Sequence, residues 1–382
     1  MIHTHTGSAP RTTAAEDFEA WFRLLETPGL GRGGARRLLA ACGSPEGVLR
    51  APAAALRQLV GAEVAAAIAK PPPHGPERLA AARRWLAAAD VAPRLTLTLD
   101  MPEYPTQLLQ TADPPLLLYV EGDVTRLAQP ALAIVGSRHA TAQGLDNARA
   151  FAAALSRQGL VVVSGLALGI DGAAHEGALE GRAGTIAVLG NGLDPVYPLR
   201  HRPLARRIAV HGALVSEFAP GTPPLREHFP LRNRIIAGLA RGTLVVEAAV
   251  HSGSLITARQ AAEAGREVFA IPGSIHSPQA RGCHALIKQG AKLVESAADI
   301  LDELPSTAGP VLPPAANQGD AGAAEPADPL LEALGHDPAT LDALQARTGC
   351  STAELTARLL ELELDGRVAR LPGGLFQRRG SA

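Results

Sequence analysis

Three groups of polar residues stand where a protein chain could bind anions. An Arg-Asn-Arg triplet at 232–234 lies within the helical stretch "FPLRNRIIAGLA", and a Ser-Gly-Ser triplet at 252–254 leads into "LITARQAAEAG". Arg138 follows the apolar run "ALAIVGS". Guanidinium groups clamp phosphate oxygens, and the unpaired N–H groups at the start of a helix favour the same anions. These residues therefore predict binding of several phosphates rather than acid–base chemistry.

The surroundings of the Arg-Asn-Arg triplet suggest how a nucleotide chain would be held. Side chains two residues apart on a helix point about 200° apart, so we expect one of Arg232 and Arg234 to face a groove and the other to serve a salt bridge or a partner. Phe229 could stack on a base, although a single phenylalanine is more often part of a core. Ser254 has an alternative role as a helix cap. Several phosphates bound in a row, with little readout of base edges, describe a groove for single-stranded nucleic acid.

The elements that must position these residues alternate between strand and helix from Leu95 to Leu304. Most of the short apolar runs are followed by a loop and an alanine-rich helical stretch. Continuously apolar strands joined by helices are typical of a parallel sheet covered on both faces. The sequence therefore predicts a doubly wound, mostly parallel α/β domain whose ligands bind beyond the carboxyl ends of the strands. The six predicted strands are "ALAIVG" from Ala131, "LVVVSG" from Leu160, "TIAVLG" from Thr185, "ALVSE" from Ala213, "TLVVEA" from Thr243 and "EVFAIPG" from Glu267.

Four sections are predicted along the chain. Residues 14–70 form a small helical domain, either a SAM-like or helix-hairpin-helix-like module whose glycine turn contacts phosphate, or a packing module alone. The α/β domain spans 95–304, and the Pro-, Ala- and Gly-rich segment 305–329 reads as a flexible linker. Segment 330–378 carries three helical patterns, then two short apolar runs around a Pro-Gly-Gly turn. Three helices followed by a hairpin predict a winged helix.

Composition narrows the class of protein. The chain has 382 residues and a net charge of −1, which hides a basic segment. Eight arginines lie between positions 200 and 241 against two acids, whereas positions 293–346 hold ten acids and no lysine or arginine. Three dispersed cysteines fit a reducing compartment better than a disulfide framework. The N-terminal stretch is polar and no apolar run reaches membrane-spanning length, so we expect a soluble, cytoplasmic protein with no membrane partner.

The common signatures of catalytic and cofactor sites do not occur in the sequence. The first strand lacks a G-x-G-x-x-G continuation, and neither a G-x-x-x-x-G-K-[ST] loop nor a G-x-S-x-G motif is present. The histidines have no H-E-x-x-H spacing, so no metal site is predicted. Asp171, Glu217 and Glu247 lie near strand ends without the spacing of an acid–base pair. We therefore expect a binding protein without catalytic residues or cofactor.

Six motifs across the α/β section resemble the DNA-processing protein A family (DprA, also called Smf), and they occur in the family's order. The N-terminal helices and the C-terminal winged helix also match the family, as weaker signals. The motifs are "AIVGSRHAT" at 133–141, "VVSGLALGIDGAAHEGAL" at 162–179, "AVLGNGLDPVYP" at 187–198, "FPLRNRIIAGLA" at 229–240, "SGSLITARQAAEAGREVFAIPG" at 252–273 and "GCHALIKQGA" at 282–291.

The resemblance implies an extended Rossmann-like fold and a cytosolic homodimer that binds incoming single-stranded DNA in natural transformation, protects it and loads the RecA recombinase. The family usually has asparagine where this chain has His284, which leaves the role of that position open. Carried over residue by residue, the implied DNA-binding residues are Gly136, Ser137, Arg138, Gly165, Phe229, Arg232, Asn233, Arg234, Ser252, Gly253 and Ser254, with Lys288 as a rim contact.

Two rival functions belong to other classes. Nucleoside-monophosphate phosphoribohydrolases have similar Rossmann-like folds, but they carry a P-G-G-x-G-T loop. Here Pro272-Gly273 continues as Ser274-Ile275, and the P-G-G at Pro372 lies in the predicted wing. The other rival is a double-stranded DNA regulator acting through the winged helix, since positions 347–379 hold six arginines against four acids.

Overall fold

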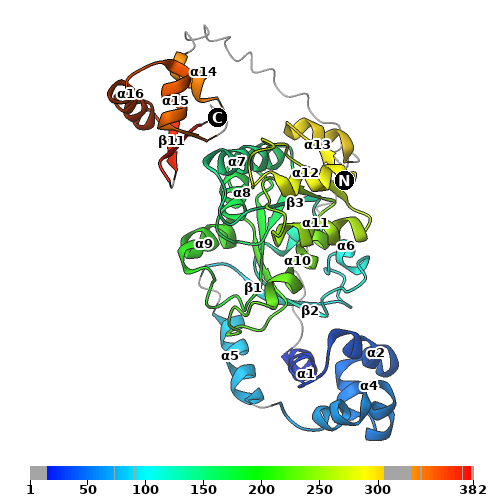
Figure 1. Cartoon of the computed structure of the whole chain (residues 1–382). Coiled ribbons are helices and arrows are strands. Elements are labelled where there is room, and N and C mark those ends of the chain that lie inside the picture. Colours follow the sequence, from blue (N-terminus) through cyan, green and yellow to red (C-terminus); the bar gives the residue numbers. More distant parts are fainter. Residues whose placement is uncertain are drawn as a thin grey trace, which may run out of the picture.

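A computed structural model describes residues 15–72, 74–88, 91–304, 328–335, 338–371 and 373–379. These residues form an N-terminal group of helices, an α/β domain and a C-terminal unit with its own small sheet (Figure 1). The predicted linker at 305–329 lies outside the described residues except for its last two positions. Within the described ranges, no helix is both long and apolar enough to cross a membrane.

Glycine and serine residues divide the N-terminal section into short helices. Gly29 turns the chain with a φ of 76°, a conformation that glycine adopts without strain. Ser44 Oγ accepts a hydrogen bond from the Gly47 N–H at 3.1 Å and so begins a new helix. Leu24, Leu38 and neighbouring apolar side chains form a small core of their own. The helices are α1 (Ala15–Leu25), α2 (Arg32–Cys42), α3 (Pro45–Arg50), α4 (Ala53–Ile68) and α5 (Gly75–Ala87).

The large sheet has nine strands in the order β1-β2-β6-β5-β4-β3-β7-β8-β9. The β1–β2 and β2–β6 pairs are antiparallel, and every other neighbouring pair is parallel. This doubly wound, mostly parallel sheet confirms the predicted fold class, and all six predicted strands are present. The strands are β1 (Arg94–Thr98), β2 (Leu117–Gly122), β3 (Ala131–Val135), β4 (Val161–Ser164), β5 (Thr185–Leu189), β6 (Ala213–Ser216), β7 (Gly242–Val245), β8 (Glu267–Ala270) and β9 (Lys292–Leu293).

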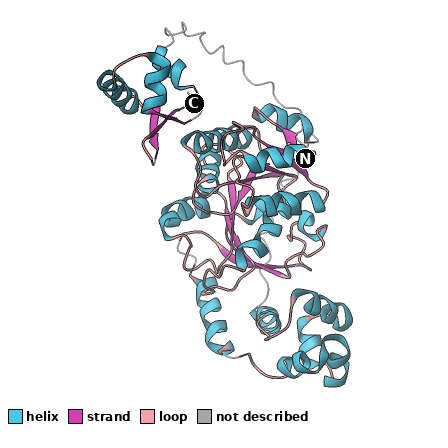
Figure 2. Cartoon of the chain, in the orientation of Figure 1, coloured by secondary structure: helices cyan, strands magenta, loops and turns pink. Residues whose placement is uncertain are grey.

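Helices cover both faces of this sheet (Figure 2). Alternate residues of β3 point to opposite faces, as the period of a strand requires. Leu132 and Ile134 join the core under α7, α8 and α13, whereas Ala133 and Val135 join the core under α10, α11 and α12. The helical elements of the domain are α6 (Thr106–Leu109), η1 (Val124–Ala128), α7 (Ala142–Arg157), α8 (Ile170–Ala178), η2 (Leu199–His201), α9 (Arg202–His211), α10 (His228–Leu239), α11 (Ser254–Glu263), α12 (Arg281–Lys288) and α13 (Ala297–Glu303).

The C-terminal unit has the predicted winged-helix architecture. Its hairpin pairs Leu371 with Leu375, while Pro372 of the predicted turn lies outside the described residues. The unit contacts α7, where the Arg379 guanidinium pairs with Asp146 at 3.1 Å. Its elements are α14 (Pro329–Leu334), β10 (Ala339–Thr340), α15 (Leu341–Thr348), α16 (Thr352–Leu364), β11 (Val368–Leu371) and β12 (Leu375–Arg378).

Candidate nucleic-acid interface

A groove of about 910 Å³ opens beyond the carboxyl ends of β3 and β7. These strands are neighbours, and β4 lies on the other side of β3. The chain therefore builds outward from β3 in one direction and later returns to add β7 and β8 in the other direction. Ligands of doubly wound sheets bind at such a reversal point, because the adjoining loops separate there and leave a crevice. The fold thus creates the groove where the sequence analysis expected a ligand.

The structure brings together most of the predicted site residues. Gly165, Arg234 and Lys288 do not line the groove. The lining does include Gly136, Ser137 and Arg138 after β3, Phe229, Arg232 and Asn233 on α10, and Ser252, Gly253 and Ser254 before and at the start of α11.

Two aromatic rings, tilted by 50° to each other, and one guanidinium form a cluster at the groove. The Arg138 Cζ lies 5.5 Å from the centroid of the Phe229 ring, and the Phe229 and Tyr197 ring centroids are 5.9 Å apart. Phe229 can approach closely because residue 190 is glycine: a Cβ there would lie 2.9 Å from the Phe229 ring. Tyr197 is 46% exposed, so its ring is accessible from solvent. Exposed aromatic faces beside guanidinium groups can stack nucleobases and hold the neighbouring phosphates.

Arg232 ties the ends of two strands to α10. Its side chain is only 4% exposed, and its Nη1 donates to the Gly165 carbonyl at 2.6 Å and to the Val188 carbonyl. Burial lowers the pKa of Arg232 to about 10, although the nearby Asp171 charge acts in the opposite direction. A Cβ at position 165 would lie 2.2 Å from Nη1. Gly165 therefore acts behind the groove, by leaving space for this guanidinium.

Two histidines fix the loop that follows β4. Leu166 has a φ of 57°, which is costly for a residue with a side chain. Its N–H donates to His175 Nε2 at 3.3 Å, and its carbonyl accepts from His201 Nδ1 at 2.9 Å. His175 Nδ1 lies 2.7 Å from Thr185 Oγ1, which itself donates to a backbone carbonyl. His175 Nδ1 must therefore be the donor, and the ring is neutral.

The Ser-Gly-Ser loop is joined to the Arg-Asn-Arg helix by one amide. Asn233 Nδ2 donates to the Gly253 carbonyl at 3.3 Å. The two serine hydroxyls, of Ser252 and Ser254, lie 2.7 Å apart and share a hydrogen bond. Donors from α10 and from the start of α11 are thus held at one edge of the groove.

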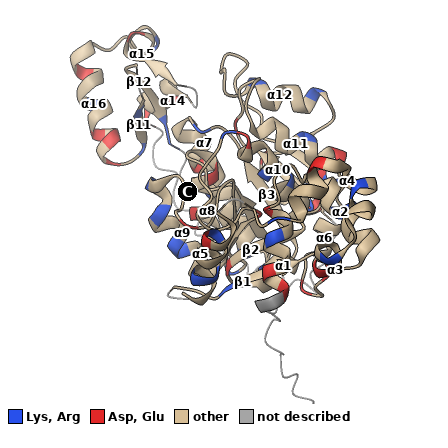
Figure 3. Ribbon diagram, turned by 90° about the horizontal axis from the view of Figure 1, so that it is seen from below, with Lys and Arg blue, Asp and Glu red and all other residues tan. Residues whose placement is uncertain are grey.

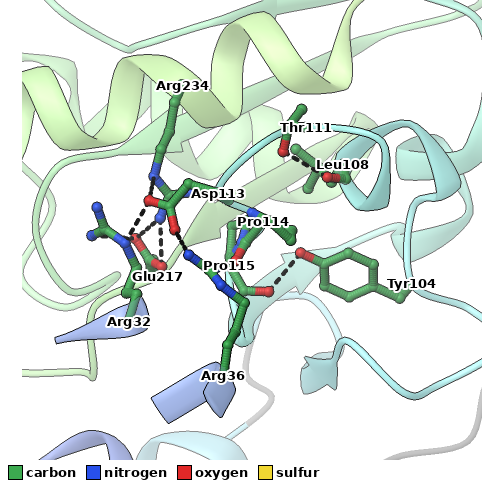
Figure 4. Close-up of polar contacts among 10 residues, drawn as sticks. All are labelled: Arg32, Arg36, Tyr104, Leu108, Thr111, Asp113, Pro114, Pro115, Glu217 and Arg234. Carbon is green, nitrogen blue, oxygen red and sulfur yellow. Dashed lines mark hydrogen bonds and ion pairs between the residues drawn. The ribbon is translucent and has the colours of Figure 1, made fainter. Parts of the chain in front are cut away.

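Arg234 belongs to an ion-pair network that includes the N-terminal helices (Figure 4). Its Nη2 donates to Glu217 at 2.6 Å, and its Nε lies 3.3 Å from Asp113. Arg32 on α2 also binds Asp113, at 2.8 Å, and Arg36 completes the group. Although burial alone raises the pKa of Asp113, the hydrogen bond from Arg36 and the charges of Arg234 and Arg32 hold it below its usual value. Arg232 therefore borders the groove with a buried guanidinium that is bound to backbone carbonyls, while Arg234 serves ion pairs. Helical spacing predicted this separation of the two side chains.

Lys288 and His284 lie on α12. Lys288 is exposed and makes no contribution to the groove lining, so its role as a rim contact stays a prediction. His284 Nε2 donates to the Gly273 carbonyl at 2.9 Å. His284, whose role the resemblance left open, therefore holds the loop after β8 through a side-chain-to-backbone hydrogen bond.

The carboxylates near the strand ends are occupied by structural contacts. Glu247 accepts hydrogen bonds from the Thr141 N–H at 2.9 Å and the Thr141 hydroxyl at 2.6 Å. Asp171 accepts from the Gly165 and Ala167 N–H groups at 3.1 and 3.3 Å. Burial raises the pKa of both carboxyls. Across the described residues, no group of His, Cys, Asp and Glu side chains could hold a metal ion.

Several groove residues were missed by the sequence analysis. Tyr197, Arg226, His251 and Gln279 line the groove but come from loops far apart in the chain. Tyr197 lies within the motif "AVLGNGLDPVYP", directly before Pro198. An aromatic residue in the loop after a predicted strand was the available signal.

The sheet order and the crevice at its reversal point define a Rossmann-like α/β protein. The protein family described as "DNA recombination-mediator protein A" matches residues 95–305, and the domain family described as "DprA winged helix domain" matches residues 313–374. Protein Smf from Escherichia coli K12 is 46% identical over 286 residues, which cover 73% of this chain and 76% of that protein. The chain belongs to the DprA/Smf family of DNA recombination-mediator proteins.

Solved structures agree with this assignment. DNA processing protein A from Streptococcus pneumoniae has a TM-score of 0.64 and 37% identity, covering 75% of this chain and 98% of that chain. DNA processing protein A from Helicobacter pylori has a TM-score of 0.50 and 29% identity, covering 55% and 94%. The latter structure concerns that protein's single-stranded DNA binding mode.

Proposed function

We propose that the groove binds single-stranded DNA by its phosphates and stacks its bases, with little sequence preference. The observation that carries this proposal is the cluster of Arg138, Phe229 and the exposed Tyr197 ring in one groove with hydroxyl and amide donors. Stacking is tolerant of sequence because every base has an aromatic face, and guanidinium contacts to phosphate carry no base information. The single-stranded DNA binding of the Helicobacter pylori relative supports the same ligand.

Family membership supports a wider role, which is also part of the proposal. The bound strand is protected during natural transformation and passed to the RecA recombinase, in the cytoplasm, by a homodimer of this chain. Light scattering of the purified protein tests the dimer, and nucleation of RecA filaments on DNA coated with single-strand-binding protein tests the loading step. An unchanged nucleation rate in the presence of the protein would contradict the proposed loading of RecA.

Filter binding tests the ligand directly. Single- and double-stranded oligonucleotides of the same sequence are compared across a range of salt concentrations. The single strand binds more tightly, and its log affinity falls with log salt by about 0.7 for each phosphate contacted. Tight binding that ignores salt, or a clear preference for duplex, contradicts the proposal.

The phosphoribohydrolase alternative has no specific support from the groove. Such an enzyme needs a carboxylate free to act on its substrate, whereas Glu247 and Asp171 are hydrogen-bonded to the loops that shape the groove. The binding function therefore accounts better for the arrangement.

A further inference from the structure

A second cavity, of about 740 Å³, lies between α5 and α9. The floor of this α5–α9 cavity is largely apolar and includes Trp85, Leu193 and Leu214, whereas Arg84, Arg202 and Arg206 contribute positive charge. Figure 3 shows basic segments on α9 with α5 beside it. The cavity therefore joins a helix of the N-terminal section to the α/β domain.

The three arginines are available to a ligand. Arg84, Arg202 and Arg206 are exposed, and none of their guanidinium groups makes an ion pair or hydrogen bond with any residue that the structure describes. The other charged residues of the lining change its net positive charge little. Arg94 pairs with Glu121 at 3.0 Å, and Asp194 contributes one carboxylate. The lining thus has excess positive charge above an apolar floor, which fits a chain of phosphates and bases.

One loop separates the α5–α9 cavity from the first groove. Tyr197 lines the first groove, while Val196 of the same loop and Leu199 at the start of η2 line the α5–α9 cavity. The Leu199 side chain is 70% exposed. A strand that stacks on Tyr197 and leaves the groove over this loop reaches Leu199 and then the α9 arginines.

We propose that the α5–α9 cavity is a second subsite for the same single-stranded DNA, which takes the part of the strand that extends past Tyr197. This proposal rests on the proposed function. Arg202 and Arg206 bind phosphates from one side and Arg84 from the other, while the apolar floor contacts bases. The N-terminal section thereby contributes directly to DNA binding.

The test compares short and long oligothymidylates, of about 6 and about 30 nucleotides, by fluorescence anisotropy, since a single-strand subsite covers on the order of 4–16 nucleotides. The short probe fills only the first groove. In the double variant Arg202→Ala/Arg206→Ala, affinity for the long probe falls on the order of tenfold or more, and its salt slope falls by about 1.4, because two phosphate contacts are lost. Affinity for the short probe is unchanged. Arg84→Ala gives a smaller loss with the same dependence on length.

Two controls separate this proposal from the proposed function. Arg207→Ala, on the same helix but outside both linings, leaves the affinity for both probes unchanged, and Arg138→Ala lowers the affinity for both.

If wild-type protein fails to bind either probe, the proposed function itself fails. If the long probe binds the double variant as tightly as wild type, the second subsite does not exist. Two other outcomes would assign the cavity to a protein partner and overturn the proposal. One is loss of the dimer in the double variant, measured by light scattering. The other is displacement of the long probe by poly-glutamate but not by unlabelled DNA.

Discussion

Replacing His175 with glutamine tests how the loop after β4 is held. The buried imidazole accepts a hydrogen bond from the Leu166 N–H and donates to Thr185 Oγ1. A glutamine side chain also has one carbonyl acceptor and an amide donor, but it does not titrate. The substitution therefore removes the proton-binding site while keeping the hydrogen-bonding types.

The expected magnitude comes from the pKa of this histidine. Burial, with further contributions from the charges of His201 and Arg232, lowers the pKa of His175 from 6.5 to about 3. The unfolded chain therefore binds a proton below about pH 6.5 that the folded chain does not bind. The contribution of His175 to the free energy of unfolding is fully present above that pH. Below it, this contribution falls by about 1.4 kcal/mol per pH unit. At pH 5 the loss is about 2 kcal/mol, or about 4 to 8 °C in Tm for a domain of this size.

The assay is urea unfolding followed by circular dichroism at several pH values from 8 to 5. Carboxylates also contribute to the pH dependence, so the informative quantity is the difference between wild type and His175→Gln. The wild type loses about 2 kcal/mol more than the variant over this range. Parallel pH profiles for the two proteins would refute the neutral, buried imidazole and the hydrogen-bond assignment built on it.

Three other outcomes follow from the structure. Arg234→Ala removes the nearer guanidinium from Glu217, which keeps only the Arg32 contact at 3.7 Å, and lowers the free energy of unfolding by about 1–3 kcal/mol in a thermal or urea melt, while exposed Arg57→Ala changes it little. Gly165→Ala forces a methyl group against the Arg232 guanidinium, which costs about 1–3 kcal/mol and weakens DNA binding measured by anisotropy. Incubation with nucleoside monophosphates, ATP or single-stranded DNA, with and without Mg²⁺, releases no base, phosphate or shortened strand, as checked by chromatography; turnover would favour the enzyme reading.

The fold was largely predictable because its inner strands are buried on both faces. Each of β3 to β8 is a short apolar run bounded by polar or glycine residues, a pattern with few other structural solutions. The outer strands β1, β2 and β9 were not predicted. β1 and β2 pair antiparallel across a long irregular connection, and β9 has two residues, so neither shows the strand–loop–helix pattern on which the prediction depended.

The candidate site was most predictable where a residue follows a strand or begins a helix. Arg138 and Ser254 meet this condition, and both line the groove. Tyr197 comes from a loop whose path depends on tertiary packing, so its place in the loop after a predicted strand was too weak a signal to select it. Helical spacing predicted that Arg232 and Arg234 would separate, but not which of them would face the groove. That choice depends on the carbonyls of Gly165 and Val188, which only the folded sheet brings together.

The affinity of single-stranded DNA for Arg138→Ala tests the central claim most directly. Arg138 is exposed at the groove and lies over the Phe229 ring, so its removal deletes the proposed charge-assisted phosphate contact without disturbing the core. We expect binding to weaken by about 1.5–3 kcal/mol with the thermal melt nearly unchanged, and Arg57→Ala to bind as wild type does. Wild-type affinity in Arg138→Ala would contradict the account, because DNA would then be bound somewhere other than this groove.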